Sequence, residues 1–271
     1  MIFLLCPSSI TYSRNCNNMD SNLVTTSRLL DKSVNNLLDD FGAGSSAPGS
    51  GSAAALMGIL SGKLIITVCS LSLKKAEQEK LGIDNGSIKS NQLKFIPFEN
   101  QLRFIIDDIK NNIEPQLKFL FEEDSKEFEK VVELRKQRVQ AENDGNKALQ
   151  SKYNKESLDK LQQVTDFVFK ISEQCFKLIE HGNFIFDKAY TAVRGDSGAA
   201  ISAAIAGVTS SIFIINLNLV SLNRRKWSKE KKQACDEMYE MLQKKQLEAF
   251  SRVGALSSEV VETMQFEIGD I

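Results

Sequence analysis

Two long segments with almost no charge constrain the fold of this chain more than any other feature. Residues 41–73 contain one charged side chain, Lys63, and residues 197–223 contain none. By length alone, either segment is able to cross a bilayer. Both are rich in Gly, Ala and Ser, the second carries Asn216 and Asn218, and neither has the Trp and Tyr belt of a membrane span. Because the central helices of a large bundle are apolar on every side, we expect two buried helices, with membrane spans as the alternative.

The remainder of the chain has the spacing of amphipathic helices. Apolar residues recur every three or four positions near residues 22–41, 95–140, 150–181 and 227–265. No proline follows Pro115, and no alternating segments flank a hairpin turn. The sequence therefore predicts an all-α protein, a multi-helix bundle with two buried Gly/Ala/Ser-rich central helices. We expect the breaks between helices at residues 42–51, 81–91, 142–147 and 181–183.

Charge and cysteine content exclude several classes of function. The net charge is −1, from 34 Lys and Arg against 35 Asp and Glu, which gives no basic field to attract nucleic acid. Five scattered cysteines form no C-x-x-C pair, so we expect neither a disulfide framework nor a metal site, and a reducing, cytoplasmic compartment. The single histidine, His181, excludes a multi-histidine metal cluster. We expect an imidazole at a helix C-terminus before Gly182, with catalysis by His181 as the alternative.

The N-terminal stretch is a poor signal peptide, because its apolar part is short and no basic residue starts it. We expect residues 1–18 to form a disordered extension, with Met19 as a possible start. Residues 19–271 show no shift in composition, and we expect them to form a single helical domain.

A glycine-rich stretch, "SSAPGSGSAAALMG", precedes the first uncharged helix. It satisfies G-x-G-x-x-A, but the preceding residues are helical rather than a strand, which excludes a dinucleotide-binding turn. "GILSGKL" that follows has the wrong spacing for a P-loop. Two interpretations stay open for the helix start: backbone N–H groups that hold an anion or oxyanion, or glycines that permit close packing. The residues concerned are Pro48, Gly49, Ser50, Gly51 and Ser52.

Three motifs in series resemble the formiminotransferase-cyclodeaminase family, specifically its cyclodeaminase/methenyltetrahydrofolate cyclohydrolase domain. "APGSGSAAALMG" is similar to the family's PGGGS-x-x-A, and "FEEDSKEF" to an acidic D-x-D-x-x-x-F-like stretch. "GDSGAAISAAIAGVTSSIFIINLNL" is similar to a Ser-Asp pair that leads into a small-residue helix and Asn-Val-x-x-Asn-Leu. The resemblance covers roughly residues 30–265 in matching order.

This resemblance implies a cytoplasmic helical homodimer that binds a tetrahydrofolate derivative and needs no other cofactor. The enzyme would either close 5-formiminotetrahydrofolate to 5,10-methenyltetrahydrofolate with loss of ammonia, or interconvert methenyl- and 10-formyltetrahydrofolate with water. A binding protein without turnover and a helical interaction protein are the alternatives.

The sequence departs from the family pattern at four places, one of which is the family's helix proline upstream of the Gly182-Asn183 turn, which is missing here. Ser50 replaces the middle glycine, and Ile214 replaces the first asparagine of the last motif, although Asn218 matches the second. Residues 184–195 are an insertion where the family has only a few residues. We expect a longer loop there, which carries Asp196 and could change the substrate.

Carboxylates are the natural acid–base groups in a chain with one histidine, because a carboxyl with a raised pKa can donate and then accept a proton. Asp124 is the first candidate and Asp196 the second. Asp124 could instead be one more solvated acid of a charged helix face. Asp196 could cap a helix that begins at Ser197.

Further residues are candidates for substrate binding. The backbone from Gly49 to Ser52 would face the pterin or a folate carboxylate. Lys63 could bind a folate glutamate or pair with an internal carboxylate, because an unpaired buried ammonium is costly. Arg194 could reach a substrate carboxylate with two hydrogen bonds, or be a solvated loop residue. Asn218 is a candidate through its motif alone.

Overall fold

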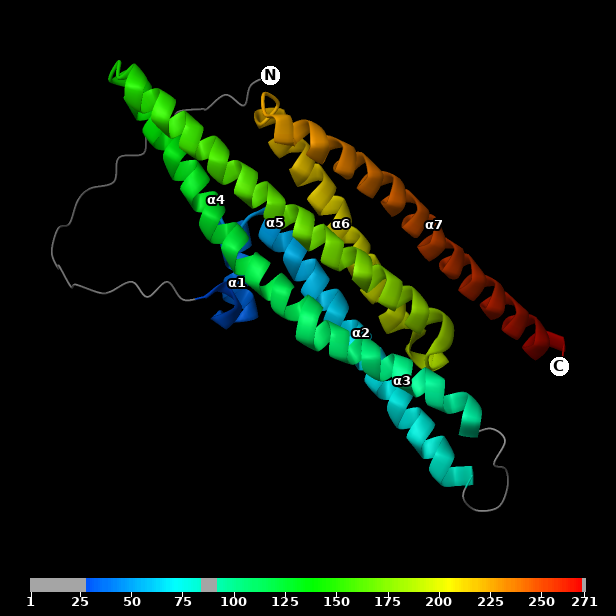
Figure 1. The fold of residues 1–271 in the computed structure, drawn as a ribbon. Helices are drawn as coiled ribbons and strands as arrows, with labels where there is room; N and C mark the ends of the chain where they lie inside the picture. The colour runs from blue at the N-terminus through cyan, green and yellow to red at the C-terminus, as the bar shows by residue number, and fades with distance from the viewer. Residues whose placement is uncertain (1–27, 84–91, 270–271) are drawn as a thin grey trace.

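The computed structural model describes residues 28–83 and 92–269, and these ranges contain helices and turns but no strand (Figure 1). After a short 3-10 turn at Leu29–Asp31, the helices are α1 (Val34–Gly42), α2 (Ser50–Ile83), α3 (Gln92–Asp108), α4 (Glu114–Asn143), α5 (Lys147–Lys188), α6 (Arg194–Ser221) and α7 (Lys226–Gly269). A π-helical turn, Ile109–Ile113, joins α3 to α4 without a loop. The predicted all-α bundle is confirmed.

The two uncharged segments form α2 and α6, which lie at the centre. Helix α2 packs against α3, α4, α5 and α6, while α6 packs against α2, α5 and α7. By length and apolarity both helices would also suffice to cross a membrane, and 50% and 44% of their most apolar windows are buried inside the bundle. The amphipathic helices cover part of α2 and α6, and apolar residues of both helices, such as Leu60 and Phe213, stay exposed in the single chain.

Glycines set the distance between the three inner helices. A Cβ on Gly58 of α2 would lie 2.9 Å from Cys175 Sγ of α5, and a Cβ on Gly207 of α6 would lie 2.7 Å from the same sulfur. The same Cβ on Gly207 would also lie 3.2 Å from the backbone oxygen of Ala54. The small-residue composition therefore serves close helix contact around Cys175.

The contacts along these helices fix their directions. Gly58 meets Cys175, and Gly62, one turn later, meets Leu178, so α2 and α5 run parallel. Gly182 of α5 meets Ile201, so α6 runs back antiparallel to both. Residues that precede Ala54 on α2 therefore lie beside residues that follow Gly207 on α6.

The predicted break at residues 181–183 is wrong, since α5 continues through it to Lys188. Gly182 is buried, and a Cβ there would lie 2.7 Å from Ile201 Cγ1, so the glycine admits α6 and does not end a helix. His181 is accordingly not at a helix C-terminus. Its Nε2 lies 2.9 Å from Asp108 Oδ2, and hydrogen bonds from Asn112 and His181 outweigh burial and lower the pKa of Asp108.

The insertion at residues 184–195 is also not the long loop that we expected. Its first residues extend α5 to Lys188, a 3-10 turn follows at Thr191–Val193, and α6 begins at Arg194. The residues "FIFDK" at 184–188 contain no Gly or Pro that would end the helix. Ile185 and Phe186 are buried, and this packing stabilises the added turn. The insertion therefore lengthens a helix.

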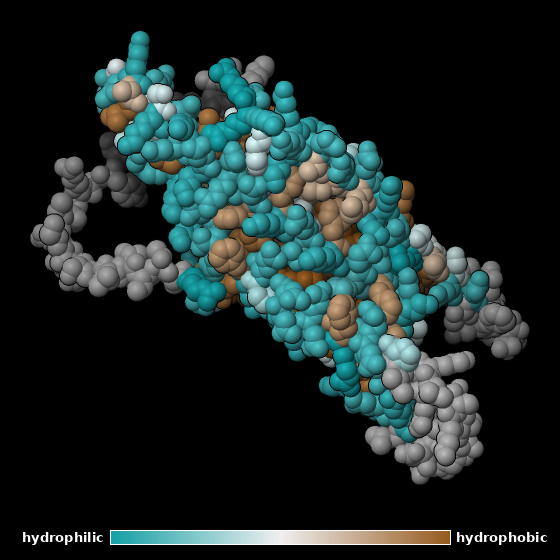
Figure 2. All heavy atoms as spheres, viewed as in Figure 1, coloured by the Kyte–Doolittle hydropathy of each residue, from teal (hydrophilic) through white to brown (hydrophobic). Residues whose placement is uncertain are grey.

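The other boundaries follow the sequence signals. The breaks at 42–51 and 142–147 are confirmed, since α1 ends at Gly42 and Asn143 is followed by α5 from Lys147. Residues 1–18 and most of the break at 81–91 lie outside the described residues. Figure 2 shows a largely hydrophilic face, with apolar side chains gathered in its middle between the long helices.

We predict that Gly207→Ala destabilises the protein by about 1–3 kcal/mol, because the added methyl group overpacks the contact with Cys175 and Ala54. Gly198→Ala is the matched control on the same helix, where a Cβ meets nothing within 4 Å. That control should be stabilised by up to about 1 kcal/mol through helix propensity. Urea unfolding of both variants measures the difference, and equal effects would contradict the close-packing argument.

Candidate active site

The carboxyl group of Asp124 lies directly against the first turn of α2. Its Oδ2 accepts a hydrogen bond from Ser52 Oγ at 3.2 Å, and the carboxyl also accepts the backbone N–H of Ser52. Ser52 Oγ is in addition 3.1 Å from the backbone oxygen of Phe121. The N–H groups of a helix start favour a negative charge, and here the anion is a side chain of the same protein.

Gly51 leaves the space that this carboxyl group occupies. A Cβ on Gly51 would lie 2.5 Å from Cγ and Oδ2 of Asp124 and still closer to Oδ1. The two interpretations of the glycine-rich stretch are therefore combined, because the glycine permits close approach and the approaching group is an anion. The donors of Ser52 already hold Asp124, which argues against a substrate carboxylate at the same N–H group.

Burial makes Asp124 a proton donor and acceptor near neutral pH. Its side chain is only 4% exposed, so the interpretation as a solvated surface acid is wrong. Desolvation raises the pKa of Asp124 to about 6, although the hydrogen bonds from Ser52 act in the opposite direction. A carboxyl group that changes charge in this range is suited to general acid–base chemistry.

Asn218 belongs to the same end of the bundle as Asp124. Leu222, one turn after Asn218 at the C-cap of α6, belongs to the same small apolar cluster as Val131, which lies two turns after Asp124 on α4. The Nδ2 atom of Asn218 is buried and has no hydrogen-bond partner among the described residues. A buried donor without a partner is costly, so the Asn218 side chain has an unused hydrogen-bond donor in this region.

Asp196 does not share a site with Asp124 in one chain. It lies eleven residues before Gly207, about 16 Å along α6, in the direction away from the start of α2. The expected N-cap role is also wrong, because α6 begins at Arg194, the N-cap is Val193, and Asp196 stands inside the first turn. An acid in that turn still interacts favourably with the helix dipole.

The two basic candidates are each paired within the protein. Lys63 Nζ lies 2.7 Å from Glu114 of α4, which confirms the internal-carboxylate alternative. Its position twelve residues after Gly51 places it about 18 Å along α2 from Asp124. Arg194 Nη1 binds both carboxylate oxygens of Glu259, at 3.1 and 3.0 Å.

One contact near the site was not predicted. The backbone N–H groups of Leu29 and Leu30 both donate to the carboxylate of Glu122, at 3.0 and 2.9 Å. These residues are more than 90 positions apart, so no local pattern in the sequence reveals the pair. The contact fastens the segment before α1 to α4 two residues before Asp124.

Thiol chemistry does not compete with Asp124. Burial raises the pKa values of Cys69 and Cys175 to about 12, which leaves these thiols protonated at neutral pH. Among the residues that the structure describes, no group of three or more His, Cys, Asp and Glu side chains is arranged to hold a metal ion.

A sequence model of the formiminotransferase-cyclodeaminase family matches residues 33–237. The chain belongs to the formiminotransferase-cyclodeaminase family. The match begins just before α1 and ends within α7, so both Gly51 and Asp124 lie inside the family region.

Two relatives agree with this membership. The methenyltetrahydrofolate cyclohydrolase of Methylorubrum extorquens is 21% identical over 238 residues, 88% of this chain and 98% of the relative. The crystal structure of formiminotetrahydrofolate cyclodeaminase from Thermotoga maritima has a TM-score of 0.65 at 12% identity, and it covers 84% of this chain and 99% of that one. At that identity the second likeness shows a shared fold.

The raised pKa of Asp124 predicts how stability depends on pH. The unfolded chain releases this proton near its ordinary pKa of 3.8, whereas the folded protein holds it until about 6. The associated stability is complete below pH 3.8 and is lost as the pH rises through 6. Asp124→Asn removes this loss, so from pH 4 to pH 7 its free energy of unfolding should gain about 2 kcal/mol relative to wild type.

Urea unfolding at the two pH values measures this gain. Asp39→Asn, at an exposed position of α1, is the control and should show no comparable change. A pH-independent difference between Asp124→Asn and wild type would show that Asp124 titrates like a solvated carboxyl.

Proposed function

We propose that this protein is an enzyme of folate one-carbon metabolism, a formiminotetrahydrofolate cyclodeaminase or a methenyltetrahydrofolate cyclohydrolase. The observation that carries the proposal is the buried carboxyl of Asp124, held at the start of α2 with a pKa of about 6. Family membership and the names of both relatives support the same chemistry.

Both reactions pass through a tetrahedral carbon between N5 and N10, so one acid–base group can serve either. In the closure, N10 attacks the carbon of the protonated formimino group, and Asp124 accepts the N10 proton as the new bond forms. The protonated carboxyl then donates to the departing nitrogen, the carbon–nitrogen bond breaks, and ammonia leaves. In the hydrolysis, Asp124 accepts a proton from the water that attacks the methenyl carbon. The protonated carboxyl donates this proton to N5 as the bond between N5 and that carbon breaks, and the remaining hydroxyl proton is released to solvent, which yields the 10-formyl product.

The surrounding residues have separate roles in this proposal. Ser52 holds the carboxyl in place through its hydroxyl and backbone N–H, and Asn218 offers its free Nδ2 to the folate. Because both proton transfers are assigned to Asp124, the chemistry needs no cofactor beyond the folate substrate. We place the enzyme in the cytoplasm, where Cys69, Cys175 and Cys235 would remain free thiols, as they are here.

The acid–base role predicts the behaviour of a charge-free isostere. Asp124→Asn should lower kcat for loss of methenyltetrahydrofolate absorbance by at least about 100-fold. In wild type, kcat/KM should fall as the pH drops through about 6, because the carboxylate form accepts the first proton. A variant that retains the wild-type rate and pH profile would remove Asp124 from the mechanism.

The measurement also separates the alternative functions. If methenyltetrahydrofolate is not consumed faster than in buffer, 5-formiminotetrahydrofolate is supplied next. Binding of either folate without turnover would identify a binding protein instead. The Asp39→Asn variant serves again as a control, since its side chain is exposed on α1.

We further propose that the enzyme is a homodimer that pairs through α6. Phe213, Leu217 and Val220 follow one face of this helix and are 68%, 70% and 69% exposed in the single chain. Leu60 of the adjoining helix α2 is 55% exposed. An apolar stripe of this kind on a central helix is typical of a protein–protein interface.

The dimer is tested by light scattering at micromolar concentration. Leu217→Asp should give a folded monomer, because the charge would be buried without a partner in the interface. Phe104→Asp, at a 58% exposed apolar position of α3, is the control and should leave the mass unchanged. A monomeric wild-type protein would refute the dimer.

A further inference from the structure

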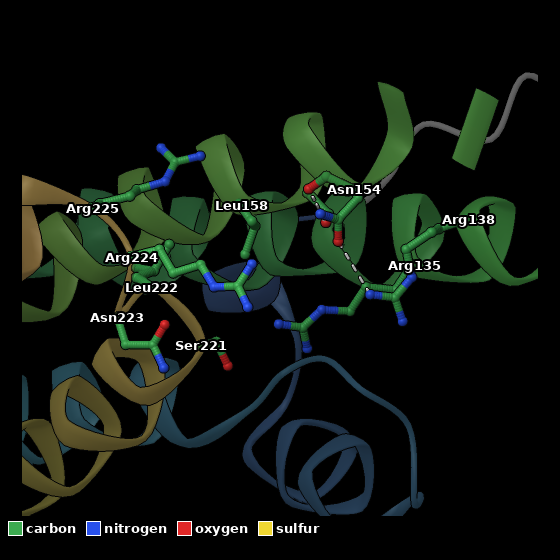
Figure 3. A pocket seen from close by; sticks show the side chains of 10 residues that line it. Arg135, Arg138, Asn154, Leu158, Ser221, Leu222, Asn223, Arg224 and Arg225 are labelled. Atoms are coloured by element: carbon green, nitrogen blue, oxygen red, sulfur yellow. Dashed lines mark hydrogen bonds between the residues drawn. The ribbon is translucent and has the colours of Figure 1, made fainter. Parts of the chain in front are cut away.

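A basic pocket lies between α4, α5 and the turn that joins α6 to α7 (Figure 3). Its volume is about 490 Å³. We call it the arginine pocket, and its lining consists of Arg135, Arg138, Asn154, Ser157, Leu158, Ser221, Leu222, Asn223, Arg224 and Arg225. Four of these side chains are guanidinium groups and none is a carboxylate.

Only one of the four charges is balanced by the protein. Arg225 points out of the pocket and binds Asp159 at 2.7 Å (Figure 3). Arg138 donates to the neutral amide oxygen of Asn154 at 3.3 Å. Across the described residues, Arg135 and Arg224 have no ion pair with a carboxylate, and Figure 3 shows their guanidinium groups directed toward one another.

This arrangement is unfavourable without a ligand. Arg135 is half-buried, and burial together with the charge of Arg138 lowers the pKa of Arg135. Guanidinium groups that converge from two elements onto one cavity repel each other until an anion enters. Arginine is suited to carboxylate because its planar fork donates two parallel hydrogen bonds.

The pocket continues the region of the candidate active site. Arg135 lies eleven residues after Asp124 on α4, an axial separation of about 16 Å, and helical side chains lean toward the N-terminal end of their helix. Leu222, which lines the pocket, shares an apolar cluster with Val131, a residue of α4 between the two positions. Asn218, whose Nδ2 has no hydrogen-bond partner among the described residues, is one turn before Leu222 of the pocket lining.

We propose that the arginine pocket binds the carboxylates at the glutamate end of the folate, with Arg135 and Arg224 as the specificity-determining residues. The inference rests on the proposed function. It assigns recognition of the substrate carboxylates to Arg135 and Arg224 instead of Lys63 and Arg194, which are both paired with carboxylates of the protein. A folate with its reacting carbon at Asp124 would extend past Asn218 and place two adjacent carboxylates between the converging guanidinium groups.

The kinetic test uses Arg224→Gln, because Arg224 is an exposed residue of a turn and its loss should leave the fold intact. We expect KM for methenyltetrahydrofolate to rise about tenfold through the loss of one charge-assisted hydrogen bond. The value of kcat should stay within about twofold, as for an interaction made equally in ground and transition states. Arg135→Gln should behave in the same way.

Arg103→Gln is the matched control. It removes the same charge from α3, where Arg103 lies 3.7 Å from Glu77, and KM should not change. A second comparison uses the methenyl derivative of tetrahydropteroate, which lacks the glutamate. Wild type and Arg224→Gln should have equal KM values for this truncated substrate. An unchanged KM for the full substrate, or an equal rise for both substrates, would overturn the proposal.

A binding measurement separates this proposal from the proposed function. Calorimetry with p-aminobenzoylglutamate requires no turnover, and Arg224→Gln should weaken its binding at least fivefold relative to wild type and Arg103→Gln. If turnover is absent and this difference in binding remains, the assignment of the arginine pocket is supported and the proposed reaction is refuted. If turnover depends on Asp124 and the difference in binding is absent, the proposed reaction is supported and the assignment of the arginine pocket is refuted.

Discussion

The contact between Asp124 and the start of α2 is the interaction on which the site depends. Helices α2 and α4 meet there because Gly51 has no side chain and Ser52 presents a hydroxyl and a backbone N–H to the carboxyl. The same contact gives the aspartate its chemistry. Burial favours the neutral acid, while the donors and the helix dipole favour the carboxylate. The balance leaves Asp124 with a pKa of about 6. Both the acid and the carboxylate, which proton transfer requires, are therefore populated near this pH.

Close packing of the inner helices makes this contact possible. Cys175 sits opposite Gly58 and Gly207, where any larger residue would separate α2, α5 and α6. A helix pair at ordinary spacing would leave room for water around the carboxyl and let its pKa return toward the solvated value. The small residues of the two uncharged segments therefore have a structural consequence for the site, in addition to their burial. Gly51 has the corresponding role between α2 and α4, where the carboxyl of Asp124 occupies the space that a side chain would fill.

The sequence predicted individual residues better than their arrangement. A short acidic motif makes Asp124 a candidate, but only its burial in the folded protein excludes the alternative interpretation as a surface acid. Asp196 was identified in the same way, yet it stands far along α6 from the start of α2. Arg135 and Arg224 gave no local signal at all, since each lies in an ordinary charged stretch and only folding brings them to one cavity. Pairings over long sequence separations depend on helix direction and register, which periodicity does not specify.

What the sequence determined by itself is the class of the fold and the identity of its central helices. Charge-free segments of helix length belong at the centre of a bundle, and the amphipathic remainder packs around part of their surface. Only the tertiary structure decided what the glycines hold. Gly182 resembles a helix stop in sequence but admits Ile201 in a continuous helix, and Gly51 resembles a phosphate loop but admits the carboxyl of Asp124. A missing Cβ fixes where space exists, and the group that fills the space comes from a distant part of the chain.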